Sequence, residues 1–202
     1  MPASDLWTHI EPHDGAHNKM FPANITRRWT TRTLALFILF FSFQPALASV
    51  SRRVSLAELV DRSTSIVVAT CSSVHSRWTP DRSQIETVAL YNVVETLKGP
   101  SRQRLTVVTL GGVVDGVGMY VSGMPAFVQD RRELLFLTAS DASSMKVVGM
   151  AQGQFHISPD AHGSALVTRS LNDTHLIGPK DQALETQQLD ALSTMIRRRL
   201  GK

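Results

Sequence analysis

Residues 85 to 97 read IETVALYNVVETL, and this stretch decides the fold that the sequence predicts. In an extended chain, successive side chains point to opposite faces. One face then carries Ile85, Ala89, Tyr91, Val93 and Leu97, and the other carries Val88, Leu90 and Val94. Apolar residues on both faces are typical of a strand that bends around a closed or nearly closed sheet, because what each face covers changes along such a strand. The stretch therefore predicts a long barrel strand.

Shorter runs on both sides of this strand predict the rest of the sheet. Residues 66–69 are rich in β-branched types and continue as a strand to about Val74, and a turn at residues 79–83 follows. Further strands are predicted at residues 104–110, 133–137, 146–150, 154–157 and 165–167. About seven short strands at this spacing predict a small, mainly β barrel or sandwich.

Helices are predicted at both ends of the β-rich region. Ser55 and Glu58 have the spacing of a capping box, so a helix should begin at Leu56 and end near Arg62. Apolar residues recur at near-helical spacing between Leu184 and Leu200, which predicts an amphipathic helix over residues 183–200. We expect that helix to lie against the barrel or to close one of its ends.

An export leader is predicted at residues 1–48. Three arginines between residues 27 and 32 precede an apolar run at residues 34–43, and the small residues 46–48 then resemble a cleavage signal. The run is shorter than the roughly 20 residues that a membrane-spanning helix needs, so contact with the membrane is expected only during export. Met20 is an alternative start, and an uncleaved anchor is an alternative to cleavage. Residues 49–202 should then form a single β-rich domain that is secreted, either periplasmic or extracellular.

Charge and cysteine content exclude some classes of protein. The formal net charge is +4 and the charges are scattered along the chain, so a nucleic-acid partner is not expected. Cys71 is the single cysteine, so the chain cannot form an internal disulfide. Its apolar strand context predicts a buried, unreactive thiol.

The order of several short motifs resembles a widespread group of exported bacterial proteins of unassigned function. These motifs are Leu97-Lys98-Gly99, Gly111-Gly112, residues 123–127, residues 133–137 and residues 149–155. The resemblance implies an OB-like barrel of the kind found in netrin-like modules and in tissue inhibitors of metalloproteinases. It also implies a protein partner of the matrixin-like metalloprotease class. Those inhibitors begin with a cysteine, whereas this mature chain would begin at Ser49, so the resemblance supports a fold rather than an activity.

Motifs that carry catalysis or bind cofactors are absent from the sequence. There is no His-Glu-x-x-His and no Gly-x-Ser-x-Gly, and Val121 stands where a dinucleotide loop starting at Gly116 would need its third glycine. We therefore predict no catalytic residues, no metal site and no cofactor.

The most informative candidate site is the glycine-rich segment from Gly111 to Phe127, which is predicted to be an irregular surface loop. Its candidate partner-binding residues are Tyr120, Met124, Pro125 and Phe127, and Trp78 is a further candidate beside the 79–83 turn. Exposed apolar side chains can anchor a partner, because each Å² of apolar surface removed from water contributes about 25 cal/mol. The alternative is that the segment folds back and covers the core.

Three hypotheses for the function follow. The first is an exported, non-catalytic binding module, protein-binding or protease-associated, that holds a protein or peptide at the Gly111–Phe127 segment or at a barrel rim. The second is a hydrolase or metal-binding enzyme whose site is assembled from distant residues such as His75, His156, Ser158 and Asp160. The third is a structural envelope protein.

Overall fold

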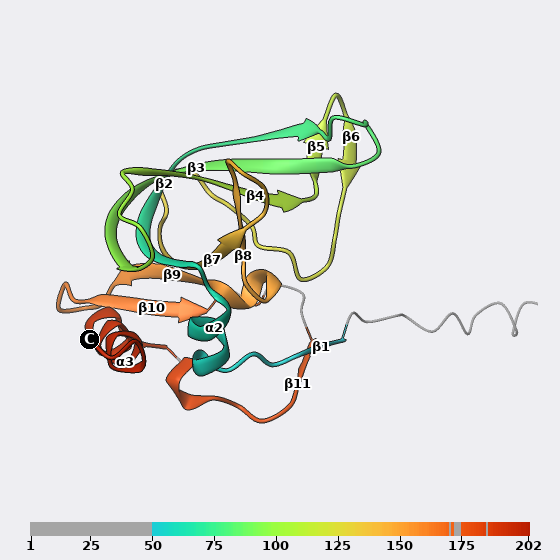
Figure 1. The fold of residues 1–202 in the computed structure, drawn as a ribbon. Helices are drawn as coiled ribbons and strands as arrows, with labels where there is room; N and C mark the ends of the chain where they lie inside the picture. The colour runs from blue at the N-terminus through green and yellow to red at the C-terminus, as the bar shows by residue number, and fades with distance from the viewer. Residues whose placement is uncertain (1–49, 170, 172–174, 185) are drawn as a thin grey trace, which may run out of the picture. The chain divides into compact units, whose positions relative to one another are not determined.

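The computed structural model describes residues 50–169, 171, 175–184 and 186–202, which are coloured in Figure 1. The chain divides into a unit at residues 1–47 and a unit at residues 48–202, and the fold described below belongs to the second. The predicted leader at residues 1–48 lies outside the described residues. No helix in the described part of the chain is both long enough and apolar enough to cross a membrane.

The described residues form twelve strands, two α-helices and two short 3-10 helices. In chain order they are β1 Val50–Arg52, α2 Leu56–Arg62, β2 Ser65–Trp78, β3 Ile85–Lys98, β4 Arg104–Leu110, β5 Gly112–Val114, β6 Val117–Met119, β7 Arg132–Ala139, β8 Met145–Val147, η1 Met150–Gly153, β9 Gln154–Pro159, β10 Ala165–Arg169, β11 His175–Ile177, η2 Gln182–Leu184, β12 Gln187–Gln188 and α3 Leu189–Arg199. The prediction of a mainly β protein with a helix near each end of this region is confirmed.

Five strands close into a barrel. The main sheet runs β12-β10-β9-β7-β2-β3-β4-β8, and β8 also pairs with β7, so the strands from β7 to β8 form a ring. The ring has five members, the number found in OB-type barrels. β2 and β3 bend around this ring, and the pairing between them shifts register at three places, which is how long strands accommodate strong curvature.

The sheet is covered by apolar packing on both faces. Inside the barrel, Val67, Ala69, Tyr91, Leu135 and Leu137 belong to one buried cluster. On the outer face, Ile66, Val68, Leu134 and Phe136 pack with residues of α2 and α3 in a second cluster. β2 and β7 are thus buried on both faces, which explains why residues 66–69 and 134–137 are continuous apolar runs.

The first helix begins and ends where the sequence predicts. Ser55 Oγ accepts a hydrogen bond of 3.2 Å from the Glu58 backbone N–H, as a helix cap does. The capping box is incomplete, because the Glu58 carboxylate is ion paired with Arg52 and Arg62.

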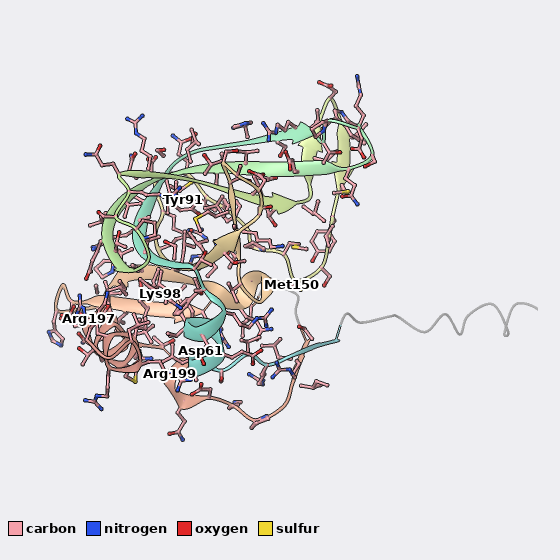
Figure 2. The ribbon with its side chains drawn as sticks, in the orientation of Figure 1. Asp61, Tyr91, Lys98, Met150, Arg197 and Arg199 are labelled. Carbon is pink, nitrogen blue, oxygen red and sulfur yellow. The ribbon has the colours of Figure 1, made fainter. Side chains whose placement is uncertain are left out.

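The C-terminal helix is shorter than predicted. α3 begins at Leu189 rather than at residue 183, because Gln187 and Gln188 pair with β10 and extend the sheet. Leu192 and Ile196 are fully buried against the outer face, and Arg199 is ion paired with Asp61 of α2 at 2.6 Å (Figure 2). The expectation that this helix lies against the barrel is therefore met by packing on the outer face.

Candidate functional site

The segment after β4 forms a β-hairpin. β5 and β6 pair antiparallel, with Val114 opposite Val117, and Asp115 and Gly116 make the two-residue turn with φ of 51° and 78°. Positive φ at both turn positions defines the tight turn that matches the twist of hairpin strands, and Asp-Gly is a preferred sequence for it. The prediction of an irregular loop is therefore wrong for Gly112–Met119. The Asp-Gly pair flanked by valines was the signal that could have revealed the hairpin.

The base of the hairpin is held against the ends of β2 and β3 (Figure 1). Thr87 Oγ1 donates a hydrogen bond of 2.7 Å to the Gly111 carbonyl and lies 3.1 Å from Ser76 Oγ. A Cβ atom on Gly112 would lie 2.3 Å from Ser76 Oγ, and the φ of this glycine is +136°. This position therefore favours glycine, and the hairpin base packs closely against β2 and β3.

The hairpin exposes apolar side chains to solvent. Val113 is 66% exposed, Val117 is 50% exposed and Tyr120, which follows β6 directly, is 73% exposed. Isolated exposed apolar residues are ordinary on protein surfaces, but these three lie within eight residues. Val113 is paired with Gly118 and Val117 with Val114, so the two valines lie on opposite faces of the hairpin. Among the predicted partner-binding residues, Tyr120 has the exposure that such a role needs.

The other four predicted residues are less accessible. Phe127 is only 9% exposed and its ring packs edge-to-face on Tyr91, with centroids 6.0 Å apart, inside the barrel cluster. Pro125 is buried, whereas Met124 and Trp78 are half-buried. For Phe127 and Pro125 the structure matches the alternative considered above, in which the segment folds back over the core.

A cavity of about 620 Å³ adjoins the returning part of the segment. Its walls include Leu110, Met124, Pro125, Val147 and Met150. The Ala151 N–H donates to the Gly123 carbonyl at 2.9 Å, which ties the segment to η1 at this point. Two predicted partner-binding residues, Met124 and Pro125, therefore line this cavity instead of projecting into solvent.

A buried carboxylate lies below this segment, inside the barrel. Glu133 is fully buried and accepts hydrogen bonds from Tyr91 Oη at 2.5 Å and from Gln154 Nε2 at 3.0 Å. It also lies 2.9 Å from His156 Nδ1. The other ring nitrogen of His156 is 3.2 Å from an Arg131 guanidinium nitrogen. Since a guanidinium can only donate, His156 Nε2 accepts and its Nδ1 carries the proton that is donated to Glu133.

The buried cluster, made of Tyr91, Glu133, Gln154 and His156, links the barrel to the segment above it. Gln154 Nε2 also donates to the Ala126 carbonyl at 2.9 Å, next to the buried Phe127. Burial, together with the Glu133 charge, raises the pKa of Tyr91 far above its ordinary value, and burial raises the pKa of the Cys71 thiol. Both groups stay protonated near neutral pH, so neither is an activated nucleophile.

Sequence reasoning missed this cluster, although part of it was visible. Glu133 lies at the same parity as Leu135 and Leu137, so the period-2 pattern of a strand already placed a carboxylate on the inner face. The positions of Tyr91 and His156 could not be read in this way, because they depend on which strands become neighbours.

The residues proposed for a dispersed enzyme site lie in different surroundings. His75 is exposed on β2 and Ser158 is exposed near the end of β9. Asp160 accepts the backbone N–H groups of His162 and Ser164 in a turn, and His156 contacts Glu133 and Arg131. Within the described ranges, no group of three or more His, Cys, Asp or Glu side chains is placed to hold a metal ion.

Comparison with protein-family models, with curated proteins and with solved structures found no match to this chain. The resemblance to exported OB-like proteins therefore stays a prediction from the motifs.

Proposed function

We propose that this protein is an exported binding module and that a protein partner binds at the β5–β6 hairpin. The observation that carries the proposal is the hairpin itself, which is hydrogen bonded at Gly111 to Thr87 and Ile85. It exposes Val113 and Val117, which lie on its opposite faces, and Tyr120 directly after β6. A paired strand has a set backbone conformation and loses less conformational entropy on binding than an irregular loop does, so more of the contact free energy appears as affinity.

The hairpin also offers a strand edge. Among the described strands β6 pairs only with β5. Val117 lies next to the turn and is paired with Val114, so the alternating pattern of an antiparallel ladder directs the N–H and C=O of Gly118 away from β5. An extended segment of the partner can pair with this edge, while its apolar side chains cover Val117 and Tyr120. Full burial of each such side chain contributes about 1.5–3 kcal/mol.

The proposed location of the protein and the proposed class of its partner rest on the sequence. The predicted leader supports a periplasmic or extracellular location, with membrane contact only during export. The motif resemblance supports a matrixin-like metalloprotease as the class of partner. The scattered charges give no support for a nucleic-acid partner.

The test is a capture experiment with matched surface variants. The full chain, carrying a C-terminal tag, is produced in its exported form and incubated with envelope extract and culture supernatant. Val117→Thr combined with Tyr120→Ser should lose the captured protein, whereas Val94→Thr, a change at a valine that is 60% exposed on β3, should retain it. The captured protein is then purified and titrated against all three forms, and a Kd at least tenfold weaker for the hairpin variant alone is expected. Equal affinity for the parent and the hairpin variant would contradict the proposal.

A further inference from the structure

The cavity beside Met124 and Pro125 has the size and the lining of a small-molecule site. Its volume of about 620 Å³ falls in the range of such sites. Every described residue of its wall lies between residues 62 and 150, a stretch that the structure describes without a gap, and none belongs to β5 or β6. Its apolar residues include Val108, Leu110, Met124, Val147 and Met150. The cavity is therefore separate from the binding hairpin and suits a ligand with an apolar body.

Two methionines of the wall are suited to contact with a ligand. Met124 and Met150 have unbranched, polarisable side chains, which adapt to the shape of what binds against them. Met150 also has a φ of 61°, which a bulky residue rarely adopts, and it follows Gly149 with a φ of 70°. Backbone conformations of this kind gather at ligand-binding sites, where the surrounding structure holds them in place.

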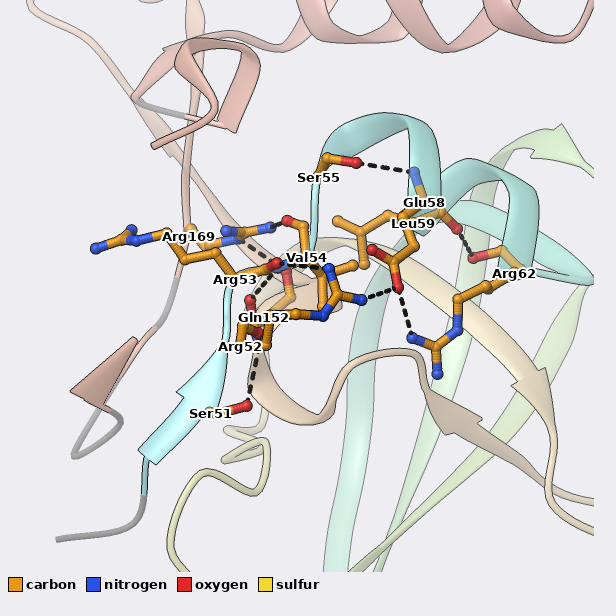
Figure 3. A network of polar contacts seen from close by, with 11 residues as sticks. Ser51, Arg52, Arg53, Val54, Ser55, Glu58, Leu59, Arg62, Gln152 and Arg169 are labelled. Carbon is orange, nitrogen blue, oxygen red and sulfur yellow. Dashed lines mark hydrogen bonds and ion pairs between the residues drawn. The ribbon is translucent and has the colours of Figure 1, made fainter. Parts of the chain in front are cut away.

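Three charged side chains of the described residues line the cavity, and two of them are already ion paired. Arg62 donates to Glu58 at 3.1 Å (Figure 3). Glu86 accepts from Arg77 Nε at 2.8 Å. The third is Lys146, whose ammonium forms no ion pair and no hydrogen bond with the described residues. The wall therefore offers one cation that is available to an anionic group of a ligand.

The cation and the apolar lining lie at different depths. Lys146 is exposed, whereas Val147 and Val148, which follow it and also line the cavity, are buried. Thr138 of β7 is paired directly with Lys146 of β8, so the two side chains lie on the same face of the sheet. A ligand with its charged group at Lys146 can thus receive a second hydrogen bond from the Thr138 hydroxyl, while its apolar part lies deeper in the cavity.

We propose that this cavity binds a small molecule with an apolar body and one carboxylate, and that Lys146 is the binding cation. A single ammonium matches the single charge of a carboxylate, and the Thr138 hydroxyl supplies a further donor. The apolar body lies against Met124, Val147 and Met150, and its removal from water supplies most of the affinity. The proposal does not rest on the binding hairpin, so either one can fail while the other stands.

The test is calorimetric titration of the full exported chain with hexanoate, octanoate and decanoate, each below the concentration at which it forms micelles. Saturable binding of decanoate is expected, and affinity should rise along the series by up to about fourfold for each added methylene, the ratio that its transfer out of water gives. Decylammonium, which has the same chain and the opposite charge, should bind at least tenfold more weakly than decanoate. Lys146→Glu should weaken decanoate binding at least tenfold, whereas Lys202→Glu, the same change at an exposed lysine after α3, should leave it unchanged.

Methionine resonances of the parent report where the probe binds, so this measurement does not depend on the folding of a variant. With methyl-labelled methionine, the signals of Met124 and Met150 should shift on titration with decanoate. The signal of Met195, which packs against the outer apolar cluster, should not shift. The proposal is overturned if decanoate does not saturate the protein, if affinity does not rise with chain length, or if Lys202→Glu weakens binding as much as Lys146→Glu does.

Discussion

Replacing Glu133 by leucine should destabilise the barrel by removing an acceptor while keeping an apolar side chain of similar size. The hydroxyl of Tyr91 would lose its 2.5 Å acceptor, and Gln154 would lose one of its two Nε2 hydrogen bonds. His156 is partly exposed, with a quarter of its side chain accessible, so water can replace its bond. Each buried donor left without an acceptor costs roughly 1–3 kcal/mol, which gives about 3 kcal/mol for the two.

The effect can be measured by thermal unfolding of the purified chain. For a domain of this size 1 kcal/mol shifts Tm by about 2–4 °C, so Glu133→Leu should lower Tm by roughly 6–12 °C. Glu95→Ala serves as the control, because Glu95 is ion paired with Arg197 at the surface, where its loss should cost at most about 1 kcal/mol.

A double-mutant cycle separates this explanation from a general loss of packing. In the parent, Tyr91→Phe should destabilise, because Glu133 Oε2 loses its donor. In the Glu133→Leu background the same change removes an unsatisfied hydroxyl, so it should be neutral or stabilising. Additive effects of the two changes would refute the account of the buried cluster.

Three further predictions test other parts of the structure. Gly112→Ala should lower Tm more than Gly116→Ala. A Cβ at Gly112 would lie 2.3 Å from Ser76 Oγ, whereas a Cβ at Gly116 would meet nothing within 4 Å. Equal shifts in Tm, measured by calorimetry, would argue against close packing at the hairpin base. Asp141 has a pKa held well below its ordinary value by hydrogen bonds from the serines that follow it, so it contributes stability that is present above about pH 4 and is lost as the pH falls further. Asp141→Asn should therefore be less stable than the parent at pH 7 in urea unfolding, with the gap narrowing towards pH 2, and a gap that is constant with pH would contradict this. The Cys71 thiol should react with a disulfide reagent at pH 8 only after unfolding in urea, since it is fully buried; rapid labelling of the native protein would show otherwise.

Local signals predicted local structure well. The cap at Ser55 and the apolar periodicity that follows it placed α2 at its observed bounds. β3 extends from Ile85 to Lys98, close to the range expected from the apolar residues on its two faces. In both cases the deciding contacts lie within a few residues or follow from a regular period, so the sequence pattern contains them.

Long-range pairing explains what the sequence did not reveal. Residues 187 and 188 became a strand because β10 lies beside them, although their place before an apolar periodic run favoured a helix. The buried cluster needs β9 beside β7 and β3 on the other side of β2, and composition carries no record of that strand order. The hairpin is different, since its Asp-Gly turn is a local signal that the glycine content of the segment obscured.

Photo-crosslinking in the producing cells tests the central claim, partner binding at the hairpin, most directly. A benzophenone amino acid replaces Tyr120, which keeps an aromatic ring at the exposed end of β6, and a second version places it at Val94 on the barrel. The account predicts a covalent adduct with a specific envelope or secreted protein from position 120, and none with that protein from position 94. The absence of an adduct at position 120, or the same adduct from both positions, would contradict the claim that the hairpin is the binding surface.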